Sequence, residues 1–274
     1  MVPSEALLEG IALRCGPLGE QDRLLTLLSE AEGITRLALP GARRPRSSLA
    51  AAMPLARLRL QVGGRRGLRR VRQLQLLRSH GALGQRLDAL AAAQGLAELC
   101  LALVPDGAAA PGMVSALDLA LNRLELVVSE RSDAAEALAI AVQASVQLLA
   151  LGGYALPLQS CARTGAALQP PVGDWDWRCS FFAAEGLVIG AIPGSQRLLT
   201  ASELALLQRL PRPAPPRRRD GALLGPLPVW LRLLALVEIW CQEHAGRSPR
   251  AFRLLRTALE PMTPTGSPLE TPSR

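Results

Sequence analysis

The sequence predicts an α+β protein, with a small N-terminal β-barrel over residues 1–80 and an all-helical domain over 81–258 that carries a small irregular insert. Apolar and polar residues alternate with a period of two before residue 80, whereas apolar residues after Gly81 recur at the i, i+4 and i+7 spacing of amphipathic helices. The charge divides in the same place. Residues 1–80 carry 14 Arg against 6 Asp and Glu, and the remainder carries 17 against 17.

Short strands are predicted at 35–39, 55–62 and 73–77. In the second of these, Leu58, Leu60 and Val62 occupy one face, and Arg57 and Arg59 lie on the opposite, solvent-facing side. Segments rich in Gly, Pro, Asp and Ser separate the alternating runs. About five short strands joined by basic loops are typical of a small barrel.

Helices are predicted where apolar residues share one face. The faces are Leu83, Leu87 and Leu90; Leu117, Leu121, Leu124 and Val128; Leu138, Val142, Val146 and Leu149; and Trp230, Leu234, Val237 and Cys241. The last of these helices spans about 228–243, and a shorter one follows at about 249–259. These helices are expected to pack as one bundle, with Trp230 and Trp240 in its core.

Three segments of the second domain are predicted to be non-helical. The irregular insert spans about 152–197 and contains Trp175, Trp177, Phe181 and Phe182. A Pro- and Arg-rich linker follows at about 209–221, and the tail at 259–274 is predicted to be disordered because it has few residues to bury.

A stretch from residue 33 to residue 87 contains 13 arginines and no acidic residue. The arginines are Arg36, Arg43, Arg44, Arg46, Arg57, Arg59, Arg65, Arg66, Arg69, Arg70, Arg72, Arg78 and Arg86. An uncompensated block of this size repels itself in the folded state, so it indicates an anionic partner. All 31 basic residues of the chain are arginine, which binds phosphate through a planar fork and stacks on bases. Two plainer explanations stay open: a solvated face without a partner, and a GC-rich genome that replaces lysine by arginine.

Aromatic residues are missing from the predicted barrel, since no Phe, Trp or Tyr precedes Tyr154. Barrels that bind single strands usually stack bases on aromatic side chains. This barrel is therefore expected to bind phosphates, with weak sequence preference and tolerance of both single- and double-stranded nucleic acid.

The sequence predicts no enzyme. His80 and His244 are the only histidines, neither lies in a nucleophile or metal motif, and no glycine-rich phosphate loop is present. Five cysteines occur singly, which indicates a reduced compartment, and the N-terminal residues lack the pattern of a signal peptide. We therefore expect a cytoplasmic protein.

Residues 7–77 resemble the RecO family of DNA repair proteins. The family pattern begins with an "EGIVL" strand, a "GExDRLVTLLT" element and a "GARRPRSRL" segment, and residues 9–13, 19–28 and 41–49 stand at these places. The closing HAGRSPRAFRLL resembles the C-terminal part of the family more loosely. The resemblance implies an OB-fold followed by a helical domain, and a nucleoid-associated mediator of recombinational repair. It further implies binding of single- and double-stranded DNA, annealing of complementary strands, contact with the C-terminal peptide of single-stranded-DNA-binding protein, and loading of RecA together with RecR.

The sequence departs from the family pattern in the insert. Many relatives carry two CxxC pairs for a structural zinc, whereas this chain has Cys161 followed by Thr164 at the second position, and Ile189 and Ile192 where the second pair is expected. Cys161 and Cys179 alone cannot complete a four-ligand site. We therefore predict no zinc and no other cofactor.

Ten arginines are predicted to contact DNA. They are Arg43, Arg44, Arg46, Arg57, Arg59, Arg65, Arg66, Arg69, Arg70 and Arg72. Annealing would follow from charge neutralisation, which lowers the repulsion between two strands held on one protein. Two alternatives stay open: an RNA-binding or ribosome-associated barrel protein, and an adaptor whose helical domain is the functional part.

Overall fold

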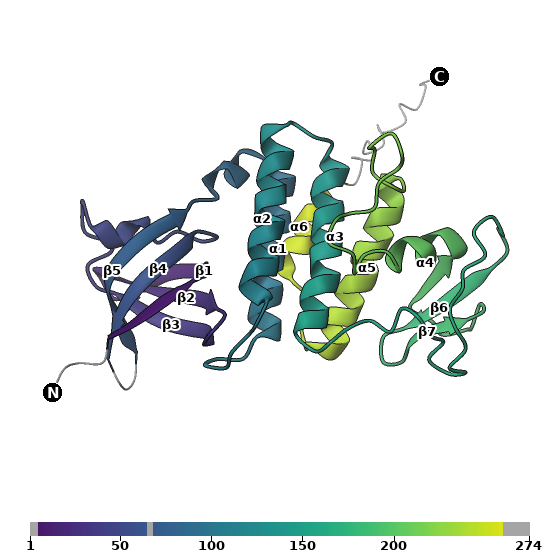
Figure 1. Cartoon of the computed structure of the whole chain (residues 1–274), viewed down its shortest axis with the longest axis horizontal. Helices are drawn as coiled ribbons and strands as arrows, with labels where there is room; N and C mark the ends of the chain where they lie inside the picture. Colours follow the sequence, from purple (N-terminus) through teal and green to yellow (C-terminus); the bar gives the residue numbers. More distant parts are fainter. Residues whose placement is uncertain (1–4, 65–67, 260–274) are drawn as a thin grey trace, which may run out of the picture.

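The computed structural model describes residues 5–64 and 68–259. A β-barrel, a helical bundle and a small second sheet follow one another along the long axis of the molecule (Figure 1). The tail that was predicted to be disordered lies outside the described residues, apart from Leu259, which ends the last helix.

The barrel contains five strands: β1 (Glu5–Leu18), β2 (Asp22–Ser29), β3 (Gly33–Leu39), β4 (Arg57–Gly63) and β5 (Arg69–Arg78). Their order is β1-β2-β3-β5-β4, and β1 also pairs with β4, so the sheet closes on itself. The closure between β3 and β5 is parallel and consists of two residue pairs. A short 3₁₀ helix, η1 (Ser48–Ala51), lies in the connection from β3 to β4. The strands predicted at 35–39, 55–62 and 73–77 are confirmed.

The inside of the barrel follows from the alternation in its strands. Leu58, Leu60 and Val62 are buried in the barrel core, and Arg59 on the opposite face is exposed. The outer face is apolar where it meets the helices: Ile11 and Leu28 belong to the hydrophobic core of the helical region. Barrel and helices therefore share a packed contact in addition to the chain connection.

The bundle consists of α1 (Leu87–Leu103), α2 (Met113–Ser129), α3 (Ala134–Leu151), α5 (Leu227–His244) and α6 (Arg250–Leu259). The apolar faces predicted for α2, α3 and α5 are buried, and so are Trp230 and Trp240. Among the described helices, α3 is long and apolar enough to cross a membrane, but 67% of that window is buried inside the bundle. Its apolar character is therefore explained by its place in the core.

The start of the first helix was predicted wrongly. Leu83 lies in a separate 3₁₀ turn, η2 (Gly81–Gln85), and Leu87 is 54% exposed. α1 is packed by α2, α3 and α6, so its small residues are buried on several sides and a single leucine face does not describe it. A Cβ on Gly95 would lie 2.2 Å from the ring of Phe252, which shows how closely α6 approaches it.

The insert is more regular than predicted. It contains an antiparallel sheet in the order β7-β6-β8, formed by β6 (Arg178–Phe182), β7 (Gly186–Ile189) and β8 (Arg197–Thr200). These strands have four or five residues each, too few to produce a clear alternation. Helix α4 (Ala201–Leu207) follows, and Thr200 and Glu203 form a capping box at its start. The segment 209–221 contains no helix or strand, as predicted.

Candidate nucleic-acid interface

Three exposed arginines, Arg43, Arg44 and Arg46, lie in the loop that follows β3, and we call them the loop cluster. Arg43 Nη1 donates to the carbonyl of Gly19 at 3.1 Å, and Arg44 Nε donates to Gln21 Oε1 at 2.6 Å. Both acceptors are neutral groups of the turn between β1 and β2. The hydrogen bonds therefore hold the guanidinium groups in place without cancelling their charge.

The backbone of this loop is fixed by the same turn. The amide of Gly41 donates to Asp22 Oδ1 at 2.7 Å, and the amide of Arg43 donates to the carbonyl of Gln21 at 2.9 Å. Arg46 has a left-handed backbone with φ of 61°, which is uncommon for a residue other than glycine. The loop cluster is therefore a pre-arranged basic surface at one end of the barrel, with Glu20 as an exposed acidic neighbour.

The two arginines predicted on the β4 face are engaged in ion pairs. Arg57 Nη2 lies 2.7 Å from Glu9 Oε1, and Arg59 Nη2 lies 3.0 Å from Glu9 Oε2. Arg57 also reaches α2, where its Nη1 lies 3.0 Å from Asp118 Oδ2. The hydrogen bond from Arg57 lowers the pKa of Glu9, and the same contact raises the pKa of Arg57. One glutamate thus neutralises part of the face that the sequence assigned to DNA.

The arginines around the β4–β5 hairpin differ from one another. Arg69 forms an ion pair with Glu32, and Arg72 Nη1 lies 2.5 Å from Glu5 Oε1. Arg70 is exposed and has no ion-pair partner among the described residues. Arg65 and Arg66, also predicted to contact DNA, lie outside the described residues.

The acid-free block is largely compensated in space, contrary to the expectation from the sequence. Of its 11 arginines that the structure describes, seven have a carboxylate within ion-pair distance: Arg36, Arg57, Arg59, Arg69, Arg72, Arg78 and Arg86. Four of the partners, Glu5, Glu9, Glu32 and Asp106, come from segments that sheet pairing or loop contacts bring beside the block. Exposed ion pairs of this kind are weak, so phosphates can compete for these arginines. The strongest uncompensated charge nevertheless lies in the loop cluster and at Arg70.

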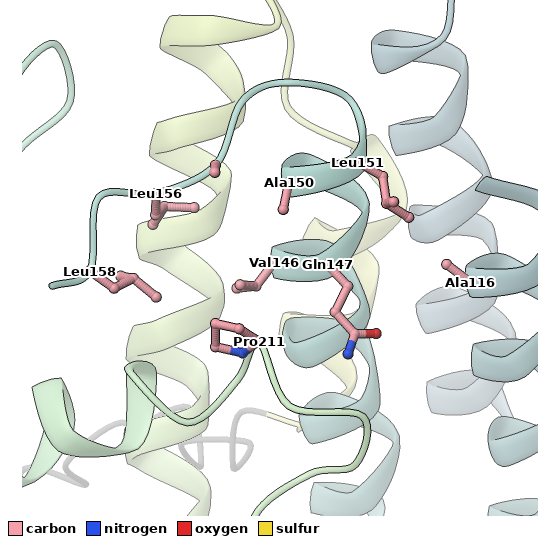
Figure 2. A pocket seen from close by; sticks show the side chains of 9 residues that line it. Ala116, Val146, Gln147, Ala150, Leu151, Leu156, Leu158 and Pro211 are labelled. Carbon is pink, nitrogen blue, oxygen red and sulfur yellow. The ribbon is translucent and has the colours of Figure 1, made fainter. Parts of the chain in front are cut away.

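A second candidate surface is an apolar pocket of about 340 Å³ on the helical region (Figure 2). Val146, Ala150 and Leu151 of α3 line it together with Leu156, Leu158 and other residues of neighbouring segments. The polar side chain in its wall is Gln147, whose Nε2 donates to the carbonyl of Arg212 at 2.8 Å. This pocket could not be predicted from the sequence, because its walls come from segments that are far apart along the chain.

The cysteines of the insert do not form a metal site with other ligands. Within residues 5–64 and 68–259, no group of three or more His, Cys, Asp or Glu side chains could hold a metal ion. Burial raises the pKa of the Cys161 thiol, but hydrogen bonds from the Thr164 side chain and from the amides of Ile189, Thr164 and Arg163 outweigh it, which brings the pKa to about 7. Burial raises the pKa of Cys179 to about 11. The residues present therefore do not fit a structural zinc.

Comparison with known proteins identifies the family of the chain. The family model for the N-terminal part of recombination protein O matches residues 3–80, and the model for its C-terminal part matches residues 84–263. The chain belongs to the RecO family. It is 60% identical over 253 residues to the DNA repair protein RecO of Synechococcus sp. strain WH7803, a match that covers 92% of this chain and 94% of the relative.

The chain is similar to RecO proteins of other organisms as well. The chain is 59% identical to the RecO of Prochlorococcus marinus strain MIT 9303 over 93% of its length and 96% of the relative. It is 37% identical to the RecO of Synechococcus elongatus over 91% of its length and 94% of the relative. The predicted family is thus confirmed, and the five-stranded barrel is its N-terminal OB-fold.

Proposed function

We propose that this RecO-family protein is a DNA-binding recombination mediator that acts by binding rather than by catalysis. The loop cluster carries the proposal: its three arginines are exposed and have no carboxylate partner among the described residues, and neutral acceptors of the β1–β2 turn hold two of them, Arg43 and Arg44. Because phosphate contacts position a strand without reading its sequence, this surface suits both single- and double-stranded DNA. Neutralising two strands on one protein would favour their annealing.

The other predicted arginines have a secondary role in this proposal. Arg57, Arg59, Arg69 and Arg72 are paired with carboxylates, so a phosphate must displace a glutamate before it can bind there. Such an exchange gains less free energy than contact with an unpaired arginine. Arg70 has no such carboxylate in the part of the chain that the structure describes, and it lies opposite Ala38, next to the end of β3 from which the loop begins.

The experiment replaces Arg43, Arg44 and Arg46 together by glutamate in the full chain. We expect annealing of complementary oligonucleotides to be lost and binding to every DNA sequence to weaken alike. The matched control replaces three other exposed arginines, Arg197, Arg218 and Arg219, by glutamate. This control should leave annealing nearly unchanged. Melting temperatures verify that both variants fold. Loss of annealing in the control alone would place the DNA elsewhere on the protein.

We further propose that the apolar pocket takes the C-terminal peptide of single-stranded-DNA-binding protein, a partner that the family resemblance implies. The pocket offers an apolar wall for a buried side chain, and two exposed arginines lie close in the chain to Pro211 of its lining: Arg212 follows it directly, and Arg209 lies two residues before it. Replacing Ala150, which points into the pocket in Figure 2, by phenylalanine should fill it and weaken binding of a labelled peptide at least tenfold. Leu126→Asp, at an exposed position on α2, is the control. If the Ala150 variant and the unchanged protein bind the labelled peptide with equal affinity, the peptide binds elsewhere on the protein.

The family also implies action with RecR and the loading of RecA at the nucleoid in the cytoplasm. In this proposal the barrel holds the DNA and the helical region receives the protein partners. An RNA-binding role would appear as stronger binding of structured RNA than of DNA of equal length. An adaptor role would appear as full function after charge reversal in the loop cluster.

A further inference from the structure

A groove lies between the barrel and the helical bundle. It consists of two cavities of about 350 and 300 Å³, and Arg14 and Arg247 line both of them. The barrel contributes outward-facing residues of β1, β2 and β3, including Arg36. The helical side contributes the end of α1, the segment before α6, and Arg250, the first residue of α6. Arginines from both regions thus meet at one junction.

A β-bulge in β1 aims Arg14 into this groove. The pairing with β2 shifts between Ala12, which faces the barrel core, and Arg14. Because Leu13 is the extra residue, both Leu13 and Arg14 point outward, whereas regular alternation would turn Arg14 into the barrel. Leu13 packs into the helical core, and Arg14 is exposed beside it.

The groove has a positive charge that is not cancelled by its own acidic residues. Two carboxylates line it: Asp106 Oδ2 lies 3.5 Å from Arg36 Nη2, and Glu98 Oε2 accepts from the neutral amide of Ala251 at 3.1 Å and so keeps its charge. Arg247 donates to the carbonyl of Leu101, a neutral acceptor. Arg14 and Arg250 are exposed and form no ion pair within the described part of the chain. Four arginines thus face two carboxylates, an excess of two positive charges, and three of the arginines have no ion-pair partner among the described residues.

The outer face of the barrel connects the groove to the loop cluster. Arg14 lies opposite Thr26, and Thr26 lies opposite Arg36, so these three form one row across β1, β2 and β3. The row two residues farther along consists of Gly16, Leu24, Ala38 and Arg70. The strands then reach the turn that holds the loop cluster, four residues or roughly 13 Å beyond Arg14. Basic residues thus line this face from the domain junction to the end of the barrel.

We propose that the groove binds backbone phosphates of the same nucleic-acid strand that the loop cluster holds, so that the strand runs along the outer face of β1–β3 into the domain junction. This inference rests on the proposed function and extends its site. A strand with regularly spaced phosphates fits a row of separated arginines better than one small anion does. The helical region then contributes directly to DNA binding through Arg247 and Arg250.

The first test is the full-length double variant Arg14→Ala, Arg250→Ala. For a long single-stranded oligonucleotide, the slope of log affinity against log salt should become shallower by about 1.4, because each lost contact releases about 0.7 of a counterion. A short oligonucleotide that the loop cluster alone can hold should bind with nearly unchanged affinity. The control Arg197→Ala, Arg219→Ala removes the same charge at a distance and should change neither value. An unchanged slope for the long oligonucleotide in the groove variant overturns the proposal.

The second test places a photo-reactive benzoylphenylalanine at Pro17, an exposed residue of the groove wall. We expect cross-linking to a labelled oligonucleotide, and loss of the cross-link in the presence of excess unlabelled DNA. Cross-linking to an added polyglutamate peptide but not to DNA would assign the groove to an acidic protein segment and overturn the proposal. A different result would overturn the proposed function itself: the variant with glutamate at Arg43, Arg44 and Arg46 would still bind and anneal DNA. The two proposals can therefore fail separately.

Discussion

Arg57 and Asp118 join the barrel to the helical bundle, with Arg57 Nη1 located 3.0 Å from Asp118 Oδ2. The same guanidinium group binds Glu9 on the neighbouring strand, so one arginine connects β1, β4 and α2. His80 is buried next to this contact, with a ring nitrogen 3.0 Å from Glu125 Oε2. Arg57 was predicted as a DNA contact, but its geometry identifies it first as a link between the two regions.

Removing this link should lower the stability of the fold. Asp118→Ala leaves part of the Arg57 charge without its partner, and we expect the free energy of unfolding to fall by about 1–2 kcal/mol, since Arg57 is still partly solvated. Urea denaturation measures the change. The control is Glu185→Ala, which breaks the exposed pair with Arg163 in the insert and should have no measurable effect. Equal losses in the two variants would contradict the role of Asp118.

Acid should weaken the barrel through the glutamates that pair with the arginine block. Hydrogen bonds from Arg57 and Arg69 lower the pKa values of Glu9 and Glu32. A carboxylate whose pKa is lower in the folded than in the unfolded state stabilises the fold above its ordinary pKa, and this contribution is lost as the pH falls through the folded pKa. Stability should therefore decline below about pH 4.5. The double variant Glu9→Gln, Glu32→Gln should show a shallower decline in urea denaturation at successive pH values, and an identical pH profile would contradict the assignment.

The sequence predicted the parts of the fold that depend on regular alternation. The strand with Leu58, Leu60 and Val62 and the helix with Trp230 and Trp240 bury the expected side chains, because burial on one face imposes a period on the sequence. The first helix was placed less well, since α1 is buried on several sides. The sheet of the insert was missed because its strands have four or five residues.

The concentration of positive charge at the candidate site could be predicted from the sequence, but the positions of its carboxylate partners could not. The sequence shows that arginines are concentrated at 33–87, yet it cannot show that Glu5, Glu9 and Glu32 lie beside them, because these contacts arise from strand pairing. Arg14 was left out for a related reason. Its outward direction depends on a β-bulge in β1. In a sequence, a bulge appears only as one interruption of the alternation between apolar and polar residues, and one interruption does not distinguish a bulge from the end of a strand.

Salt should weaken the binding of single-stranded DNA steeply. Five arginines of the described barrel are exposed and have no ion pair: Arg14, Arg43, Arg44, Arg46 and Arg70. If each binds one phosphate, the barrel alone should give log affinity a slope of about −3.5 against log salt, since each contact releases about 0.7 of a counterion, and contacts with Arg247 and Arg250 in the groove would make the slope steeper. Fluorescence anisotropy at several salt concentrations gives the slope. A value near zero would show that the protein does not bind a polyanion through these charges.

Base composition should have little influence on affinity. The barrel contains no aromatic residue, because the first one in the chain is Tyr154. Without stacking on rings, oligo-dT and oligo-dA of equal length should bind within about tenfold of each other, or 1.4 kcal/mol, at one salt concentration. Stronger discrimination would indicate that exposed Trp175 of the insert or another part of the helical region contacts bases. Trp175→Ala should then remove the difference.

The insert should be stable without zinc. Its two cysteines are buried and supply at most two of the four ligands that a structural zinc needs, and within the described residues no group of three or more His, Cys, Asp or Glu side chains could hold a metal ion. The region is held instead by packing: the ring centroids of Phe181 and Trp240 lie 6.1 Å apart, which fastens β6 to α5. Elemental analysis of the purified protein should therefore find far less than one zinc per chain, and a chelator should leave the melting temperature unchanged. Phe181→Ala should lower the free energy of unfolding by about 3–5 kcal/mol, as is usual for a buried phenylalanine. Stoichiometric zinc together with a small effect of Phe181→Ala would show that metal rather than aromatic packing holds the insert.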